Sequence, residues 1–255
     1  MTATNSSFLK WLNILAFALM VIVNGLAGST TIIGGKNTAQ ISDANPTLIT
    51  PAGYVFSIWG IIYMLLGIFV FYQALPNQKA KEFREKVGYL FIASSVLNTV
   101  WLFLWQFEYL IFSVVVIFLL LATLIATYLR LGIGKSAVSP REKIVFHVPF
   151  SVYLGWITIA SIANVATALV SVNWDGFGIS LETWATLIVV IALLITLLVV
   201  VTRKDLAYGL VVIWAFVGIA VKQGTNQTIA TITEASAIII AITIIIITLL
   251  SKLKR

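Results

Sequence analysis

Cysteine is absent from this chain, and histidine occurs only once, at His147. Without cysteine there is no disulfide, no thiol nucleophile and no thiolate metal ligand. A metal centre needs several nitrogen, oxygen or sulfur ligands together, and His147 near the inner end of an apolar stretch is expected to be a simple interfacial residue. We therefore predict no catalytic residues and no metal site.

Charge is also scarce. Charged residues make up 10% of the chain and hydrophobic residues 60%, and the mean hydropathy is +1.06, whereas soluble domains carry about 25% charged residues. The nine acidic residues fall in the polar breaks or at the ends of apolar stretches. Ion-coupled carriers place carboxylates or histidine within their spans, and acid–base enzymes use positioned carboxylates. Both classes are disfavoured, and no phosphate-binding glycine motif is present.

What the chain has instead is a series of apolar stretches, each close to the roughly 20 residues that cross a bilayer. They cover residues 11–28, 52–75, 87–107, 109–130, 144–170, 183–202, 206–222 and 231–250. Backbone groups in lipid must be satisfied internally, so these stretches predict helices. The expected fold is an all-α integral membrane protein of about eight transmembrane helices in one membrane domain.

The basic residues divide unequally between the two sets of polar breaks. One set holds Lys10, Lys79, Lys81, Arg84, Lys86, Arg130, Lys135, Arg141, Lys143, Arg203, Lys204, Lys252, Lys254 and Arg255. The other holds only Lys36 and Lys222. Because loop cations mark the cytoplasmic face, both termini are predicted to be cytoplasmic. The net charge of +7 then reflects orientation and contact with anionic lipid, and no nucleic-acid partner is expected.

The polar and aromatic residues are unevenly distributed among the stretches. Stretches 183–202 and 231–250 are nearly all aliphatic and are expected to face lipid. The longest outer loop, residues 29–50, is polar and contains glycine, and loops of this length are usually functional or disordered.

Three helical stripes gather tryptophan, tyrosine and asparagine at spacings of three or four residues, which place side chains on one helix face. The stripes are Trp59, Tyr63 and Gly67; Asn98, Trp101 and Trp105; and Tyr153, Trp156, Ala160 and Asn164. Such stripes are typical of helix–helix interfaces, where small residues and amides bring helices together. They also suit an apolar pocket for a flat hydrophobic ligand. Both interpretations stay open at this point.

The motifs around these stripes resemble a known family. Pro51-Ala-Gly-Tyr-Val-Phe-Ser-Ile-Trp59-Gly-Ile-Ile-Tyr63, Asn98-Thr-Val-Trp101-Leu-Phe-Leu-Trp105 and Trp156-Ile-Thr-Ile-Ala160-Ser-Ile-Ala-Asn164 are similar to the second-, third- and fifth-helix signatures of the tryptophan-rich sensory protein family (TspO, or translocator protein). The resemblance covers about residues 8–170, and we divide the chain into a TspO-like five-helix bundle, 1–170, and three additional transmembrane helices, 171–255. Ser57 stands in place of a family proline, and the spacing from Phe56 to Trp59 is one residue short.

The resemblance implies a pocket formed by the first, second, third and fifth helices and covered by the first loop. Family ligands include porphyrins, haem-like tetrapyrroles and sterols. The matching positions are Trp59, Tyr63, Asn98, Trp101, Trp105, Tyr153, Trp156, Ala160 and Asn164. No cofactor is required, and protoporphyrin or haem is expected as a ligand rather than a prosthetic group.

The leading hypothesis is a membrane-embedded binding protein, sensory or transporting, for a hydrophobic and tetrapyrrole-like molecule. Two alternatives stay open: a facilitator-type transporter of another amphipathic solute, and a porphyrin-degrading enzyme that works by light or radical chemistry. The expected location is a bacterial cytoplasmic membrane, and a homodimer is an open alternative.

The charge distribution makes one testable prediction. The absence of cysteine allows single reporters at Ser136, in a basic loop, and at Thr38, in the long loop. Because the basic loop is predicted to be cytoplasmic, an impermeant thiol reagent added outside cells should label Thr38→Cys and not Ser136→Cys. External labelling of Ser136→Cys would reverse the orientation.

Overall fold

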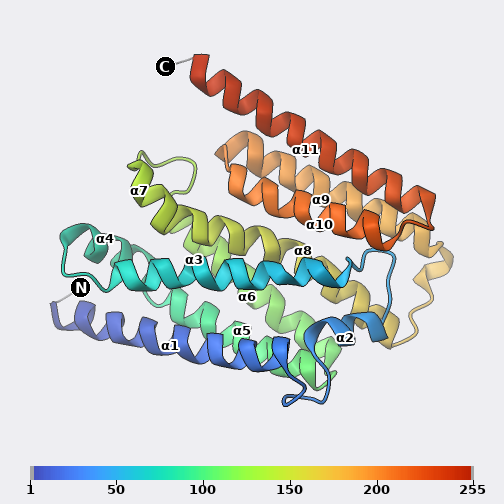
Figure 1. Ribbon diagram of the computed structural model, residues 1–255, viewed down its shortest axis with the longest axis horizontal. Helices are drawn as coiled ribbons and strands as arrows, with labels where there is room; N and C mark the ends of the chain where they lie inside the picture. The colour runs from blue at the N-terminus through green and yellow to red at the C-terminus, as the bar shows by residue number, and fades with distance from the viewer. Residues whose placement is uncertain (1–2, 254–255) are drawn as a thin grey trace.

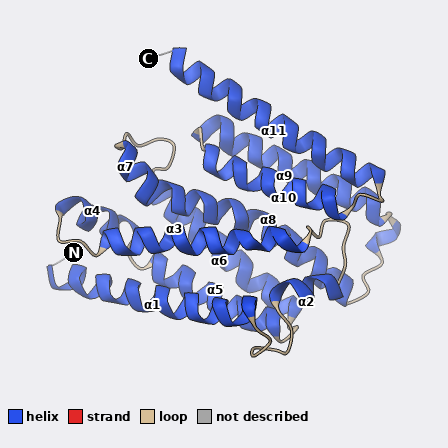
Figure 2. Ribbon diagram, in the orientation of Figure 1, coloured by secondary structure: helices blue, strands red, loops and turns tan. Residues whose placement is uncertain are grey.

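The structure is a computed structural model that describes residues 3–253, and every regular element in that range is a helix (Figures 1 and 2). The long helices are α1 (Ala3–Ser29), α3 (Ile58–Gln73), α5 (Leu90–Gln106), α6 (Leu110–Arg130), α8 (Val148–Ser171), α9 (Leu181–Arg203), α10 (Leu206–Lys222) and α11 (Gln227–Leu253). The short ones are α2 (Thr38–Ala44), η1 (Gly53–Ser57), α4 (Gln78–Val87), α7 (Pro140–Glu142), the π-helical turn η2 (Lys143–His147) and η3 (Gly176–Gly178).

Each apolar stretch of the sequence coincides with a long helix. Within the described residues, 6 helices are long and apolar enough to cross a membrane, and α4 with α5 would make a seventh if that pair, bent by 54°, is one span. The remaining apolar helix, α10, is shorter, with 17 residues. The expectation of an all-helical, multi-pass membrane protein is confirmed.

The helices pack as a bundle around α8 (Figure 1). Helix α8 contacts α3, α6 and α10, while α1 packs on α3 and α5. On the other side, α9, α10 and α11 lie side by side, and α10 joins them to α8. A side chain at Gly155 would meet the backbone oxygen of Tyr208 at 3.1 Å, so glycine lets α8 and α10 approach closely.

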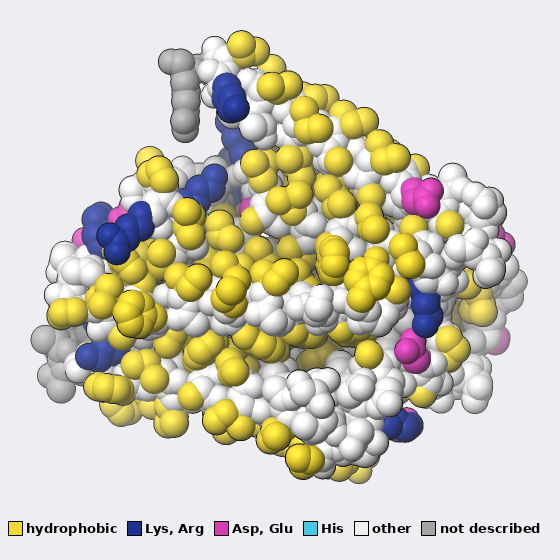
Figure 3. All heavy atoms as spheres, viewed as in Figure 1, with side chains coloured by type: hydrophobic (Ala, Val, Ile, Leu, Met, Phe, Trp, Pro, Cys, Tyr) yellow, Lys and Arg dark blue, Asp and Glu magenta, His cyan; other side chains and the backbone are white. Residues whose placement is uncertain are grey.

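The surface separates apolar and charged side chains as a bilayer requires (Figure 3). Hydrophobic side chains cover the middle of this face, and basic side chains gather mainly at one end of the bundle. Helix α4 is amphipathic and basic and sits at that end; it ends at Val87, and Gly88, with φ +56°, separates it from α5, which begins at Leu90. Lys254 and Arg255, two of the basic residues used to orient the chain, lie outside the described residues.

His147, expected from the sequence to be interfacial, lies just before α8 and is buried. Its side chain is 3% exposed and lies edge-on to Phe83, with ring centroids 6.5 Å apart. Phe83 of α4 also stacks on Phe146, with ring centroids 3.8 Å apart, so α4 packs against η2, a contact that the linear sequence does not reveal.

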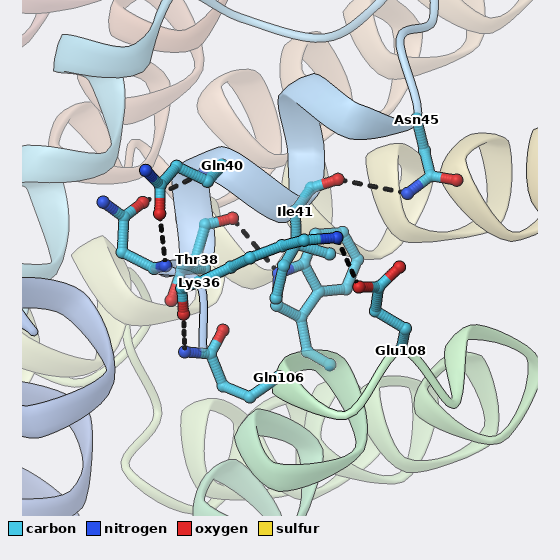
Figure 4. Close-up of polar contacts among 9 residues, drawn as sticks. Lys36, Thr38, Gln40, Ile41, Asn45, Gln106 and Glu108 are labelled. Atoms are coloured by element: carbon cyan, nitrogen blue, oxygen red, sulfur yellow. Dashed lines mark hydrogen bonds and ion pairs between the residues drawn. The ribbon is translucent and has the colours of Figure 1, made fainter. Parts of the chain in front are cut away.

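The long loop 29–50 is folded rather than open. Asn37 and Gln40 form a capping box that starts α2. The buried Gln106 donates from Nε2 to the carbonyl oxygens of Ala27 at 3.2 Å, Ile33 at 3.2 Å and Lys36 at 2.9 Å, and Figure 4 shows it beneath the loop. Gly34, with φ +74°, lies directly against the backbone of Gln106, where any other residue would clash. We call residues 30–50 the lid.

Ion pairs hold both sides of the lid. Lys36 Nζ lies 2.6 Å from Glu108 Oε1 (Figure 4), and Lys222 Nζ lies 2.9 Å from Asp43 Oδ1. The two basic residues of the predicted outer face therefore each bind a carboxylate across the lid. Because Thr38 is only 8% exposed, it is a poor labelling site, and the exposed Thr31 should replace it.

The lid anchor can be tested with Gln106→Leu. The change leaves three backbone carbonyls without their donor, and a lost buried hydrogen bond costs about 1–3 kcal/mol. We expect amide hydrogen exchange over residues 37–44 to become about ten to a hundred times faster. The control is Gln227→Leu, because the Gln227 amide bonds only Thr231 on its own helix. Equal exchange in both variants would contradict the anchoring role.

Candidate ligand-binding pocket

The three stripes meet at Trp59. Its ring stacks on Tyr63 with centroids 5.6 Å apart, and it lies 5.9 Å from Trp101, 6.2 Å from Tyr153 and 6.0 Å from Trp156. One aromatic residue on α3 thus touches rings from its own helix, from α5 and from α8. The nine sequence-predicted site residues are therefore brought together in one region of the bundle.

A chain of buried hydrogen bonds supports this cluster. Asn24 donates from Nδ2 to Asn98 Oδ1 at 2.7 Å, and Asn98 donates from Nδ2 to the Tyr153 hydroxyl at 3.0 Å. Asn98 is 0% exposed. Polar side chains between membrane helices are stabilised by each other, so this chain ties α1, α5 and α8 together.

The indole groups of α5 are also anchored. Trp101 donates from Nε1 to Asn164 Oδ1 at 2.7 Å, and Asn164 exchanges hydrogen bonds with Ser113 on α6. Trp105 donates to the Thr38 carbonyl in the lid at 3.2 Å. The interface interpretation therefore holds for Asn98, Trp101 and Asn164, whose polar groups bond other side chains of the protein.

Beside Trp59 lies a cavity of about 450 Å³, which we call the α1–α3 cavity. It is lined by Asn24, Gly25 and Gly28 of α1, by Asn37, Thr38 and Ala39 of the lid, and by Phe56, Trp59 and Tyr63. None of its described lining residues is charged. Ligand pockets have volumes of about 300–1,000 Å³ and mostly apolar walls with a few polar groups, which fits this cavity.

Across Trp59 is a second, much smaller space of about 30 Å³, lined by Trp101, Trp105, Trp156, Ala160 and Asn164 among others. The predicted site residues therefore do not share one pocket. Trp59 lines both spaces and Tyr63 only the larger one. Asn98 and Tyr153 line neither space. Their hydrogen bond to each other lies behind the lining residues and supports them.

Two buried polar groups near Trp59 have no hydrogen-bond partner within the described chain: the Tyr63 hydroxyl and Trp156 Nε1. Leaving a buried donor unpaired costs about 1–3 kcal/mol. Tyr63 borders the larger cavity and Trp156 the smaller one.

Sequence reasoning missed the contribution of α1. Asn24 and Gly28 are four residues apart and so lie on one helix face, and Gly25 is adjacent. A side chain added at Gly25 or Gly28 would meet nothing within 4 Å, so glycine here leaves room for a ligand rather than for another helix. An amide and two glycines within an apolar stretch were the available signal.

The fold and the cavity define a multi-pass helical membrane protein with an aromatic-walled pocket under a folded lid. Comparison with protein families gives a match to the TSPO-like protein family over residues 10–249. The chain belongs to this family, as the motifs predicted, and the match also includes α9, α10 and α11, which the motif resemblance did not cover. No curated protein and no solved structure matches the chain.

The role of the Asn24–Asn98–Tyr153 hydrogen bonds can be tested with Asn98→Leu. The change removes two hydrogen bonds between membrane helices, and such bonds contribute about 0.6 kcal/mol each on average. We expect the free energy of unfolding, measured by denaturant titration in mixed micelles, to fall by about 1–2 kcal/mol.

The matched control is Thr99→Ala on the same helix, because the Thr99 hydroxyl bonds only Ser95 one turn earlier. It should change the free energy of unfolding by less than about 0.5 kcal/mol. Equal losses in both variants would show that the Asn24–Asn98–Tyr153 chain has no special role.

Proposed function

We propose that this protein binds a flat, hydrophobic small molecule of the tetrapyrrole class in the α1–α3 cavity, as the binding step of a sensor or a carrier. The observation that carries the proposal is the uncharged cavity of about 450 Å³ beside the stacked rings of Trp59 and Tyr63. Aromatic rings favour offset stacking or edge-to-face contact with other rings, so a planar aromatic ligand suits this wall.

The polar groups around the cavity suggest how a ligand would be oriented. Asn24, Asn37 and Tyr63 border it from three elements. A few placed polar groups in an apolar pocket fix the orientation of a ligand. The pyrrole nitrogens or the polar edge of a tetrapyrrole could fill this role.

The lid supports a gated site. Its residues 37–39 line the cavity, and its position depends on Gln106 and on two exposed ion pairs. Exposed ion pairs contribute only about 0–1 kcal/mol, so they can break and reform without unfolding the bundle. Lid opening toward the outer face is therefore the proposed entry route.

We further propose eight spans with cytoplasmic termini. Helices α5 and α10 have 17 residues each, at the lower end of the range that crosses a bilayer. With all eight long helices counted as spans, nearly all the basic residues fall on one side, as the positive-inside pattern requires. A bacterial cytoplasmic membrane is the proposed location.

Ligand binding can be tested with Trp59→Ala and Trp156→Ala. Each change removes an aromatic surface beside the cavities, and tryptophan is a frequent hot spot whose loss costs about 2 kcal/mol or more. We expect the Kd for protoporphyrin IX, titrated in nanodiscs in the dark, to rise at least about tenfold for Trp59→Ala and by a smaller factor for Trp156→Ala.

The control is Trp11→Ala, because Trp11 is 62% exposed on α1 and lines neither cavity. Its Kd should stay within about twofold of the wild-type value. If all three variants bind equally well, the aromatic cluster serves packing alone and the proposed site is wrong.

A further inference from the structure

The described chain contains a second large cavity, outside the TspO-like five-helix pattern. It has a volume of about 420 Å³ and lies between α8, α9 and the second half of the lid, and we call it the α8–α9 cavity. Its walls include Leu48 and Ile49 of the lid, Ala166 and Leu169 of α8, and Trp184 and Ile188 of α9. The expectation that the stretch 183–202 simply faces lipid is therefore wrong for this side of α9.

Two tryptophans form an aromatic wall of this cavity. Trp174 and Trp184 lie with ring centroids 5.4 Å apart, and both line it. Trp184 donates from Nε1 to the Gly176 carbonyl at 2.9 Å, which fixes the orientation of its indole. Gly176 has a φ of +68°, a backbone conformation that glycine adopts without the strain a side chain would bring, so glycine suits this turn.

The chemistry of the α8–α9 cavity matches that of the α1–α3 cavity. Among the residues that the structure describes, no charged side chain lines it. Its polar end consists of Thr47 and Gln223, and Gln223 Nε2 donates to the Thr47 carbonyl at 3.1 Å. Both cavities thus offer an indole wall, aliphatic sides and a neutral polar end, which suits an uncharged, flat, aromatic molecule.

Two small spaces lie between the two cavities, and each space shares lining residues with its neighbours. The space of about 30 Å³ shares Thr38, Phe56 and Trp59 with the α1–α3 cavity. It shares Ile159 and Ala163 with a further space of about 20 Å³. That last space shares Ile49 and Ile188 with the α8–α9 cavity. Each small space holds about one water, so a ligand cannot pass between the two cavities in this structure. We call this row of spaces the path.

The lid borders both ends of the path. Residues 37–39 line the α1–α3 cavity, and residues 46–49 line the α8–α9 cavity. Helix α2 begins within the first segment, at Thr38, and ends at Ala44, close to the second. A ligand that displaces one segment therefore acts on the element that covers the other cavity.

We propose that the α8–α9 cavity is a second binding site for the same class of ligand, an uncharged, flat, aromatic small molecule. The ligand class rests on the proposed function, whereas the site itself rests on its own walls. Helices α9 and α10 and the Trp174–Trp184 turn then supply a second position for the ligand beyond the five-helix bundle.

The test is the number of ligand molecules bound per chain. The probe is protoporphyrin IX dimethyl ester, which lacks free carboxylates, measured by equilibrium dialysis with phosphatidylcholine nanodiscs and corrected with empty nanodiscs. The wild-type protein should bind two molecules. Ala166→Phe, which fills the α8–α9 cavity, and Trp59→Ala, which removes a wall of the α1–α3 cavity, should each leave one.

Two further variants keep the test decisive. Trp184→Ala removes the indole wall without adding volume, and it should also leave one molecule bound if Ala166→Phe proves unstable. Ala235→Phe adds the same side chain as Ala166→Phe on an exposed position of α11 and should still bind two.

The outcomes separate the two proposals. Suppose that the wild-type protein binds one molecule, and that this molecule is lost in Trp59→Ala but kept in both Ala166→Phe and Trp184→Ala. This result would overturn the second site and leave the proposed function intact. If the one molecule is instead kept in Trp59→Ala and lost in both Ala166→Phe and Trp184→Ala, the result would support the α8–α9 cavity and overturn the α1–α3 site. No bound probe in the wild-type protein would overturn both.

Discussion

In the hydrocarbon region a polar side chain can be satisfied only by another protein group, and this constraint fixes how the helices of this protein meet. Asn98 joins Asn24 to Tyr153, and Asn164 joins Trp101 to Ser113. Each set crosses between helices that are far apart in sequence. Few arrangements of the bundle could satisfy both sets, so they fix the relative positions of α1, α5, α6 and α8.

The same constraint operates at the basic end of the bundle, where α10 begins. Asp205 caps α10 through the Tyr208 backbone amide, and its carboxylate also accepts hydrogen bonds from Tyr128 at 2.9 Å and Ser151 at 2.7 Å. In the middle of α10, Trp214 donates from Nε1 to the Val55 carbonyl at 3.1 Å, and nearer its other end the Gly218 carbonyl accepts from the Ala52 amide at 3.0 Å. Helix α10 is thus fastened to the bundle at both ends, which agrees with the family match extending to residue 249.

The lid is held by one buried anchor and by two weaker, exposed ion pairs. Gln106 is 1% exposed and holds three carbonyls of the α1–lid segment, whereas the Lys36–Glu108 and Lys222–Asp43 pairs are exposed to solvent. Buried hydrogen bonds are costly to break and exposed ion pairs are not. The Gln106 hydrogen bonds therefore hold the lid firmly, whereas the two ion pairs can break and let parts of the lid open. This arrangement suits a covered cavity.

The sequence by itself determined the helices, their approximate ends and the faces that carry Trp59, Trp101 and Trp156, because apolar length and helical spacing are local properties. It also identified the family from three motifs. It did not show that α4 covers His147, that loop 29–50 folds as a lid, or that Gly25 and Gly28 border a cavity. Nor did it show that Asn98 and Tyr153 support the site from behind, or that α9 has a cavity wall as well as a lipid face. These features depend on contacts between residues far apart in the chain, and whether a small residue admits a neighbouring helix or leaves a space is decided only when the whole bundle packs.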